Sequence, residues 1–205
     1  MSSSTSTGGA LAALRRYARP RATEEFCELC NIRIAPVHRH LLEVAARRIT
    51  CACDACALRF QDVVAGRFKL IPRDPRALPG MTVPDAEWES LALPINLAFF
   101  FFSTPAQKMV ALYPSPAGAT ESLLPLETWE TLVLENPALG TLQPDVEALL
   151  VNRVAGAREY LIAPIDTCFE LTGIIRMHWR GLSGGQEVWD RIGAFFMNLK
   201  ETSRA

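Results

Sequence analysis

Residues 26–60 read FCELCNIRIAPVHRHLLEVAARRITCACDACALRF, and this stretch decides how the first part of the chain folds. It contains five of the six cysteines of the chain, and four of these form two CxxC pairs. The pairs are Cys27/Cys30 and Cys53/Cys56, and Cys51 stands beside the second pair. Two thiolates three residues apart on a tight turn can bind one metal ion, and two such turns complete a tetrahedron. The spacing therefore predicts a metal site with four sulfur ligands.

The expected ligands are Cys27, Cys30, Cys53 and Cys56, and the expected metal is Zn²⁺. Thiolates are soft ligands, and a tetrahedron of four sulfurs suits this redox-inert ion. Because four protein ligands leave no position open for water, the site is expected to be structural. Cys51 is the alternative to Cys53, since residues i and i+2 of a strand face the same side. It could instead be a thiol beside the ligands, and His38 and His40 are further substitutes.

Iron in the same tetrahedron is the alternative that the spacing leaves open. Paired CxxC turns also build rubredoxins, which carry single electrons. In the rubredoxin pattern a glycine commonly follows the second cysteine of each pair, whereas Asn31 and Ala57 stand at these positions here. Asn tolerates the left-handed backbone conformation and Ala does so poorly. The sequence therefore favours zinc over iron.

Composition narrows the class of protein. A chain of 205 residues is long enough for one large domain, or for one domain and a small module. The net charge of −1 gives no electrostatic argument for binding nucleic acid or an anionic membrane. No apolar run reaches the ~18 residues of a membrane span, and mostly polar residues follow Arg15-Arg16, unlike an export signal. We expect a cytoplasmic protein, in which clustered cysteines bind metal rather than form disulfides.

Three segments are expected along the chain. They are a flexible tail with a short helix (1–25), a cysteine metal-binding module (26–62) and an α+β domain (63–205). In the module, a strand over 48–53 leads into the second cysteine turn and a short helix over 55–60, with Asp54 as its N-cap. This order of elements is similar to that of zinc-ribbon and treble-clef heads.

The α+β domain is expected to contain separate groups of strands and helices. Apolar runs predict strands over 97–102, 108–113, 146–151 and 159–163, and helices over 125–135, 167–179 and 186–201. The first two strands are apolar throughout, which predicts a central position with both faces covered. Residues 114–120 are expected to form a rigid loop, and Asp166 and Ser183 to cap helices. The grouping favours a mainly antiparallel sheet packed with C-terminal helices.

No catalytic constellation is recognised in the sequence. Gly181–Gly185 matches the GxSxG pattern, but a helix is expected before Ser183 and no histidine follows it, so a turn is favoured. Cys168 lies among apolar residues and is interpreted as a buried core thiol. The chain has neither a GxGxxG motif nor a P-loop, so nucleotide binding has no support. The remaining enzymatic candidates are Arg176, His178 and Arg180, and a loop with Ser115, Thr120 and Glu121.

Several motifs resemble one uncharacterised bacterial family. They are FCELC, HRHLLE, ITCACDACALRF, ALYPSPAGATESLLPLETW, PDVEALLVNR and IIRMHWRGLSGGQEVW. The family is a domain of unknown function recurrently encoded beside genes of nickel–iron hydrogenases, notably of the actinobacterial type, and the resemblance covers about residues 14–199. It implies a partner system, either hydrogenase assembly or the mature enzyme, and no established activity. The family's cysteine head corresponds to the five cysteines above, and its usual glycine after the second cysteine is replaced by Asn31.

We therefore expect a non-enzymatic accessory or interaction protein, with a zinc-closed head on an α+β body. The resemblance implies that it docks onto hydrogenase subunits or maturation proteins. A rubredoxin-like electron carrier with iron in the cysteine site is one alternative. An enzyme of unknown reaction is the other.

Overall fold

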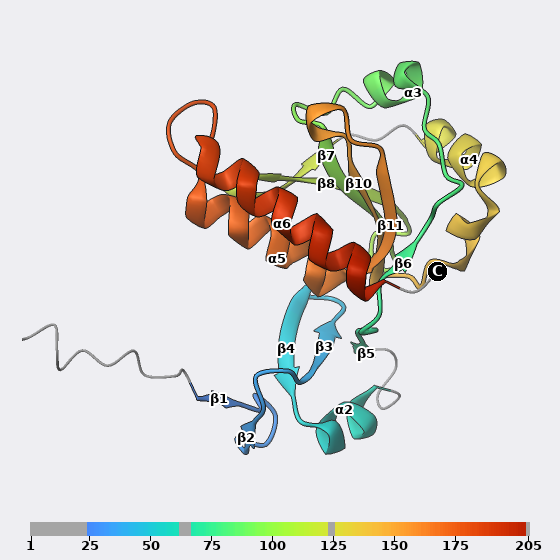
Figure 1. Ribbon diagram of the computed structural model, residues 1–205. Coiled ribbons are helices and arrows are strands. Elements are labelled where there is room, and N and C mark those ends of the chain that lie inside the picture. Colours follow the sequence, from blue (N-terminus) through green and yellow to red (C-terminus); the bar gives the residue numbers. More distant parts are fainter. Residues whose placement is uncertain (1–23, 62–66, 123–125, 204–205) are drawn as a thin grey trace, which may run out of the picture.

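The computed structural model describes residues 24–61, 67–122 and 126–203. The expected tail and short helix of residues 1–25 lie almost wholly outside these ranges. Figure 1 shows a small head, residues 24–71, beneath a larger body, residues 72–203. Within the described ranges, no helix is both long and apolar enough to cross a membrane.

The head consists of two small antiparallel sheets and one helix. Strand β1 (Glu25–Phe26) pairs with β2 (Arg33–Ile34), and the second sheet has the order β4-β3-β5. Its strands are β3 (Arg39–Glu43), β4 (Arg48–Ala52) and β5 (Phe68–Leu70). Helix α2 (Asp54–Phe60) follows β4 directly. The cysteine turn, hairpin and helix follow one another as in a treble clef, and β5 extends the sheet beyond the expected module of 26–62.

Strand β3 connects the head to the body, because its side chains point alternately to opposite faces of the sheet. Leu41 packs with Ala52 and Phe68 in the small core of the head. Its neighbour Leu42 belongs to a core of the body, together with Ile71. The sheet is therefore covered by the cysteine-bearing elements on one face and by the body on the other.

The body is built on a six-stranded antiparallel sheet with the order β6-β11-β10-β7-β8-β9. The strands are β6 (Arg76–Ala77), β7 (Leu97–Ser103), β8 (Lys108–Ser115), β9 (Gly118–Ser122), β10 (Glu147–Asn152) and β11 (Glu159–Pro164). Strand β7 pairs with β8 and β10, and Phe99 and Phe100 enter different cores on its two faces. The central, doubly covered position predicted for this strand is confirmed.

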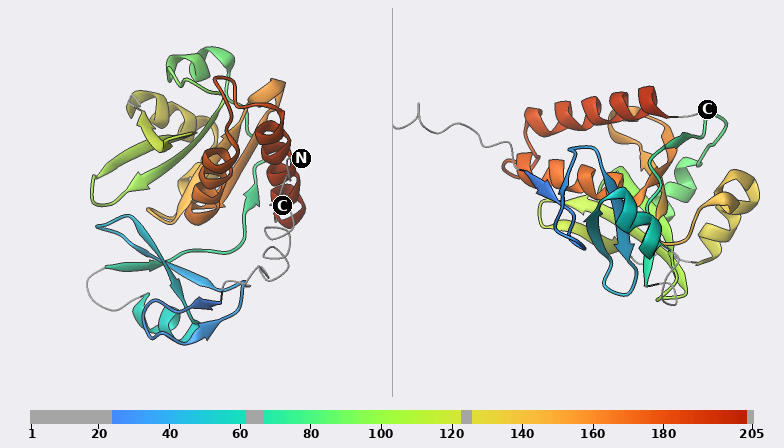
Figure 2. Two further views of the ribbon diagram at one scale, coloured as in Figure 1. Left: turned by 90° about the vertical axis from the view of Figure 1, so that its left-hand side faces the viewer. Right: turned by 90° about the horizontal axis from the view of Figure 1, so that it is seen from below.

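Helices cover both faces of this sheet, as the two views of Figure 2 show. Helices α5 (Ile165–His178) and α6 (Gln186–Thr202) contribute to the core on the face that also receives Leu42. The other face is covered by α3 (Asp85–Ser90), α4 (Leu126–Glu135) and η1 (Pro137–Thr141). A short turn η2 (Val154–Gly156) joins β10 to β11. The predicted α+β class, with antiparallel strands and C-terminal helices, is confirmed, and Cys168 is fully buried as expected.

The structure differs from the sequence-based expectation between residues 114 and 120. This segment was expected to be a loop, but β8 continues to Ser115 and β9 pairs back with it, so that Pro114 lies opposite Ala119. The expectation was wrong because proline is compatible with a strand where its missing N–H is not needed for pairing. Residues 76–77, where the sequence predicted no strand, form β6 at the edge of the sheet.

The predicted helix caps are also wrong. Cys53, not Asp54, is the N-cap of α2, because its sulfur accepts a hydrogen bond from the backbone N–H of Cys56 at 3.4 Å. Helix α5 begins before Asp166, and the N-cap of α6 is Gly185 rather than Ser183. In each case a side chain of capping type stands near the helix start without closing it.

Candidate metal centre

Two local structures carry the paired cysteines. The first is the turn between β1 and β2, which is closed by hydrogen bonds from Asn31 N to Cys27 O at 2.7 Å and from Cys27 N to Ile32 O at 2.8 Å. Asn31 has a φ of 60°, a left-handed conformation that Asn tolerates better than most residues. The second is the start of α2, where Cys53 is the N-cap and Cys56 lies in the first turn. Both pairs therefore present two sulfurs from one rigid turn.

The structure brings these four sulfurs together, since the Sγ atoms of Cys27, Cys30, Cys53 and Cys56 all lie within 4.8 Å of one another. The Sγ atoms of Cys30 and Cys53 are 3.7 Å apart, and neither residue is in a disulfide. A disulfide would bring them to about 2.05 Å. Two sulfurs bound at about 2.3 Å to one tetrahedral ion are about 3.8 Å apart. The four cysteines therefore fit one shared metal ion.

The pKa values of two cysteines in the cluster are also consistent with a bound cation. Burial raises the pKa of Cys27, but backbone N–H groups of Cys53, Leu29 and Cys30 outweigh this and lower its pKa to about 6. At Cys56, burial and the neighbouring cysteine sulfurs raise the pKa instead. The fold thus stabilises the thiolate of Cys27, and a positive charge between the sulfurs would favour ionisation of Cys56.

Cys51 and the two histidines form a group separate from the four sulfurs. Cys51 lies on β4 directly opposite His40 on β3. The ligand atoms of His38, His40 and Cys51 lie within 4.8 Å of one another. Strand β4 ends at Ala52, so the alternation that was expected to carry Cys51 and Cys53 to the same side stops between them.

Sequence reasoning missed the partner of this second group, Asp166. Its carboxylate Oδ2 lies 2.7 Å from Nδ1 of His40, across 126 positions of the chain. Nothing in the local pattern around Asp166 indicates this contact, because it depends on how the head packs on α5. The spacing His38-x-His40 is the one signal that could have placed both rings on one face, since residues i and i+2 of a strand face the same side, but no strand was predicted there.

Four of the enzymatic candidates make structural contacts, namely His178, Arg180, Ser115 and Thr120. His178 Nδ1 lies 3.0 Å from a carboxylate oxygen of Glu187. The guanidinium of Arg180 donates hydrogen bonds to the carbonyl oxygens of Met177 and Trp179. Ser115 and Thr120 hydrogen-bond each other across the β8–β9 hairpin at 3.2 Å.

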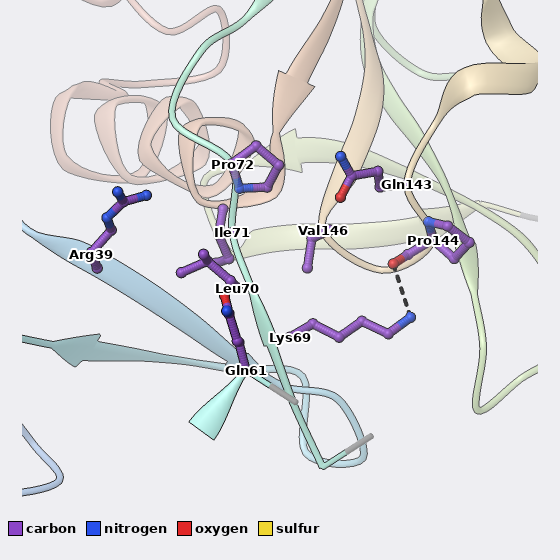
Figure 3. Close-up of a pocket in the computed structure, with 9 residues that line it drawn as sticks. All are labelled: Arg39, Gln61, Lys69, Leu70, Ile71, Pro72, Gln143, Pro144 and Val146. Carbon is purple, nitrogen blue, oxygen red and sulfur yellow. Dashed lines mark hydrogen bonds between the residues drawn. The ribbon is translucent and has the colours of Figure 1, made fainter. Parts of the chain in front are cut away.

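A cavity of about 540 Å³ lies between the head and the body (Figure 3). Lys69 crosses from the head to donate to the carbonyl oxygen of Pro144 at 3.2 Å, and it also pairs with Asp145 at 2.6 Å. Among the described residues, the lining contains no cysteine, histidine or carboxylate. Its ionisable lining side chains are Arg39 and Lys69, and the amine of Lys69 is held by Asp145 and by the carbonyl oxygen of Pro144.

Comparisons with known proteins give a family and no further relative. The model of a family of unknown function, DUF5947, matches residues 26–203. No curated protein and no solved structure matches the chain.

Proposed function

We propose that this chain, which belongs to that family of unknown function, is a non-enzymatic accessory protein whose head is closed by one zinc ion. The observation that carries the proposal is the convergence of four cysteine sulfurs within 4.8 Å from two separate turns. Four protein ligands fill a tetrahedral shell and leave no position for water or substrate. The ion would hold β1, β2 and α2 together rather than take part in a reaction.

The geometry of the second turn supports zinc over iron. After the first pair, Asn31 adopts the positive φ that the rubredoxin pattern provides with glycine. After the second pair, Ala57 continues helix α2, and its N–H donates to Cys53 O at 2.8 Å. Only one of the two turns therefore resembles a rubredoxin turn, and the other resembles the helix start of a treble clef.

Exposed apolar side chains on the head support an interaction role. Large apolar residues are usually buried, and several exposed ones in a small module favour contact with a partner. Those of the head are Phe26, Ile32, Val37 and Leu58. The partners that we propose are subunits or maturation proteins of nickel–iron hydrogenases, and the support for them is the resemblance of the sequence motifs.

The metal part of the proposal is tested by elemental analysis and visible absorption of protein purified from its own host. We expect a colourless protein, and we expect Cys30→Ser/Cys56→Ser to hold one equivalent of zinc less than the parent. Cys168→Ser is the matched control, because this buried thiol lies outside the cluster. Iron with visible absorption would instead support the electron carrier.

The partner part is tested separately by affinity purification from the same host. We expect hydrogenase subunits or maturation proteins to co-purify with the tagged chain, and to be lost with the Cys30→Ser/Cys56→Ser variant. Recovery of the parent chain without any hydrogenase component would contradict this part of the proposal and leave the metal site unaffected.

A further inference from the structure

A second set of metal-ligand side chains lies on the β3–β4 hairpin. The Nε2 atoms of His38 and His40 are 3.1 Å apart, and Cys51 completes the group. Cys51 and Ile49 are two positions apart on β4 and so share one face of the strand. Ile49 packs against the core of the body, so Cys51 also lies on the face toward the body. Ala52, on the other face, packs in the core that includes Cys27. The two groups of ligands therefore lie on opposite faces of the same sheet.

Hydrogen bonds at the Nδ1 atoms fix the proton of each ring. His38 Nδ1 lies 2.9 Å from the carbonyl oxygen of Ala35 and 3.3 Å from a carboxylate oxygen of Glu25. His40 Nδ1 lies 2.7 Å from the carboxylate of Asp166. Carbonyl and carboxylate oxygens accept hydrogen bonds, so both Nδ1 atoms carry hydrogen. In each neutral ring, Nε2 then presents a lone pair.

Two Nε2 atoms that face each other at 3.1 Å need a cation between them, either a shared proton or a metal ion. Two nitrogens bound at about 2.05 Å to one tetrahedral zinc ion are about 3.3 Å apart, close to the observed separation. The His38 side chain is only 8% exposed, so bulk water reaches it poorly. Cys51 adds a sulfur from the facing strand, which as a thiolate supplies negative charge.

We propose that His38, His40 and Cys51 bind a second divalent transition-metal ion, with Zn²⁺ the best match to two imidazoles and one thiolate. Asp166 is a positioning residue: it holds the ring of His40 through Nδ1, as carboxylates commonly do behind metal-bound histidines. Three protein ligands leave one tetrahedral position for water or for a donor atom of another molecule. Unlike the four-cysteine site, this site is open.

The location of this site ties metal binding to the packing of the head on the body. The three ligands come from the head, and Asp166 comes from the first turn of α5 in the body. A metal ion that fixes His40 therefore also fixes the carboxylate contact between the two parts. The inference does not depend on the hydrogenase link or on the identity of the metal in the four-cysteine site.

Metal stoichiometry and X-ray absorption at the zinc edge test the proposal on the full chain. Zinc is added to the metal-depleted parent, and we expect two equivalents to bind, with histidine nitrogen among the ligands. The variant His38→Ala/His40→Ala is expected to bind one equivalent with sulfur ligands alone. His178→Ala is the matched control and is expected to keep two, because its ring pairs with Glu187.

Asp166→Asn separates positioning from ligation. It keeps all three ligands, and we expect the second equivalent of zinc to bind about 10–100-fold more weakly. The proposal is overturned if the zinc spectrum of the folded parent contains sulfur ligands only, whatever number of equivalents it binds. The spectrum of the parent decides the matter even if a variant fails to fold. Loss of the four-cysteine site would instead be seen as a parent with nitrogen-rich ligation alone, so the two proposals fail differently.

Discussion

Asn31 shows how one residue closes the first cysteine turn. Its φ of 60° lies in the left-handed region, where a Cβ atom costs about 1–2 kcal/mol and Asn pays less than most residues. We predict that Asn31→Ala lowers the free energy of unfolding by about 1 kcal/mol, whereas Asn31→Gly is more stable than the Ala variant. Urea unfolding of the zinc-loaded proteins measures both. An Ala variant as stable as the Gly variant would contradict the prediction.

Asp145 is a buried carboxylate that joins the head to the body. Only 4% of its side chain is exposed, and it accepts hydrogen bonds from Lys69 Nζ and from the backbone N–H and hydroxyl of Thr104. We predict that Asp145→Ala destabilises the protein by about 2–4 kcal/mol, because it leaves these donors without their acceptor. The matched change Lys69→Met is expected to cost less, since Asp145 keeps both hydrogen bonds from Thr104. Equal losses in urea unfolding would contradict this reading.

At the scale of elements, the turn between α5 and α6 depends on two glycines in different ways. Gly184 has a φ of 88°, and an added Cβ would lie 2.8 Å from Val188 and 3.2 Å from the ring of Trp179. Gly181 has a φ of 62° and nothing within 4 Å of that position. A side chain at Gly184 would therefore cause both backbone strain and steric crowding, whereas a side chain at Gly181 would cause backbone strain alone.

We predict that Gly184→Ala lowers the free energy of unfolding by roughly 2–4 kcal/mol and Gly181→Ala by about 1 kcal/mol. The Gly184→Ala change should also alter the fluorescence of Trp179 and Trp189, whose ring centroids are 5.8 Å apart. Chemical unfolding followed by tryptophan fluorescence measures both effects. Similar losses for the two variants would show that crowding does not matter at this turn.

Elements with a strong apolar pattern were predictable from the sequence. Strands β7 and β10 are nearly continuous apolar runs, and α6 carries one apolar face, so each was placed within a few residues. Strands β6 and β9 were missed. Their short, mixed sequences have little strand propensity of their own, and pairing with β11 and β8 supplies the order.

At the scale of the whole molecule, the head and the body depend on metal to different degrees. Among the residues that the structure describes, the buried part of the head core consists of five, three of which are Cys or Ala, whereas the body has two large cores on one sheet. We predict that removing zinc with a chelator abolishes amide-exchange protection in β1, β2 and α2 while the six-stranded sheet keeps most of its protection. Hydrogen exchange by mass spectrometry measures this.

Returning zinc to the same sample is the control, and it should restore protection in the head. Equal loss of protection in β7 and β10 would contradict the prediction, since it would mean that the two parts unfold as one unit. Full amide-exchange protection in the metal-free head would also contradict the prediction, since it would mean that the head stays folded without zinc.

The two groups of ligands also differ in how far the sequence could reveal them. The four-cysteine cluster was predictable, because each pair is a local turn and its chemistry depends on spacing alone. The group around His40 required the register of β3 on β4 and a contact with α5 that is 126 positions away. Long-range packing of this kind leaves no trace in a local pattern.

The two-sided strand β3 has a consequence for how the chain folds correctly. A slip of one position would move one of Leu41 and Leu42 into the place of the other, bring the neighbouring His40 or Glu43 into the vacated place, and turn His40 away from Asp166. Such a misalignment would bury a polar side chain in one of the two hydrophobic layers and would also lose the contact between His40 and Asp166. The register of the β3–β4 hairpin is therefore strongly specified, and a folding chain that pairs these strands out of register gains much less stability.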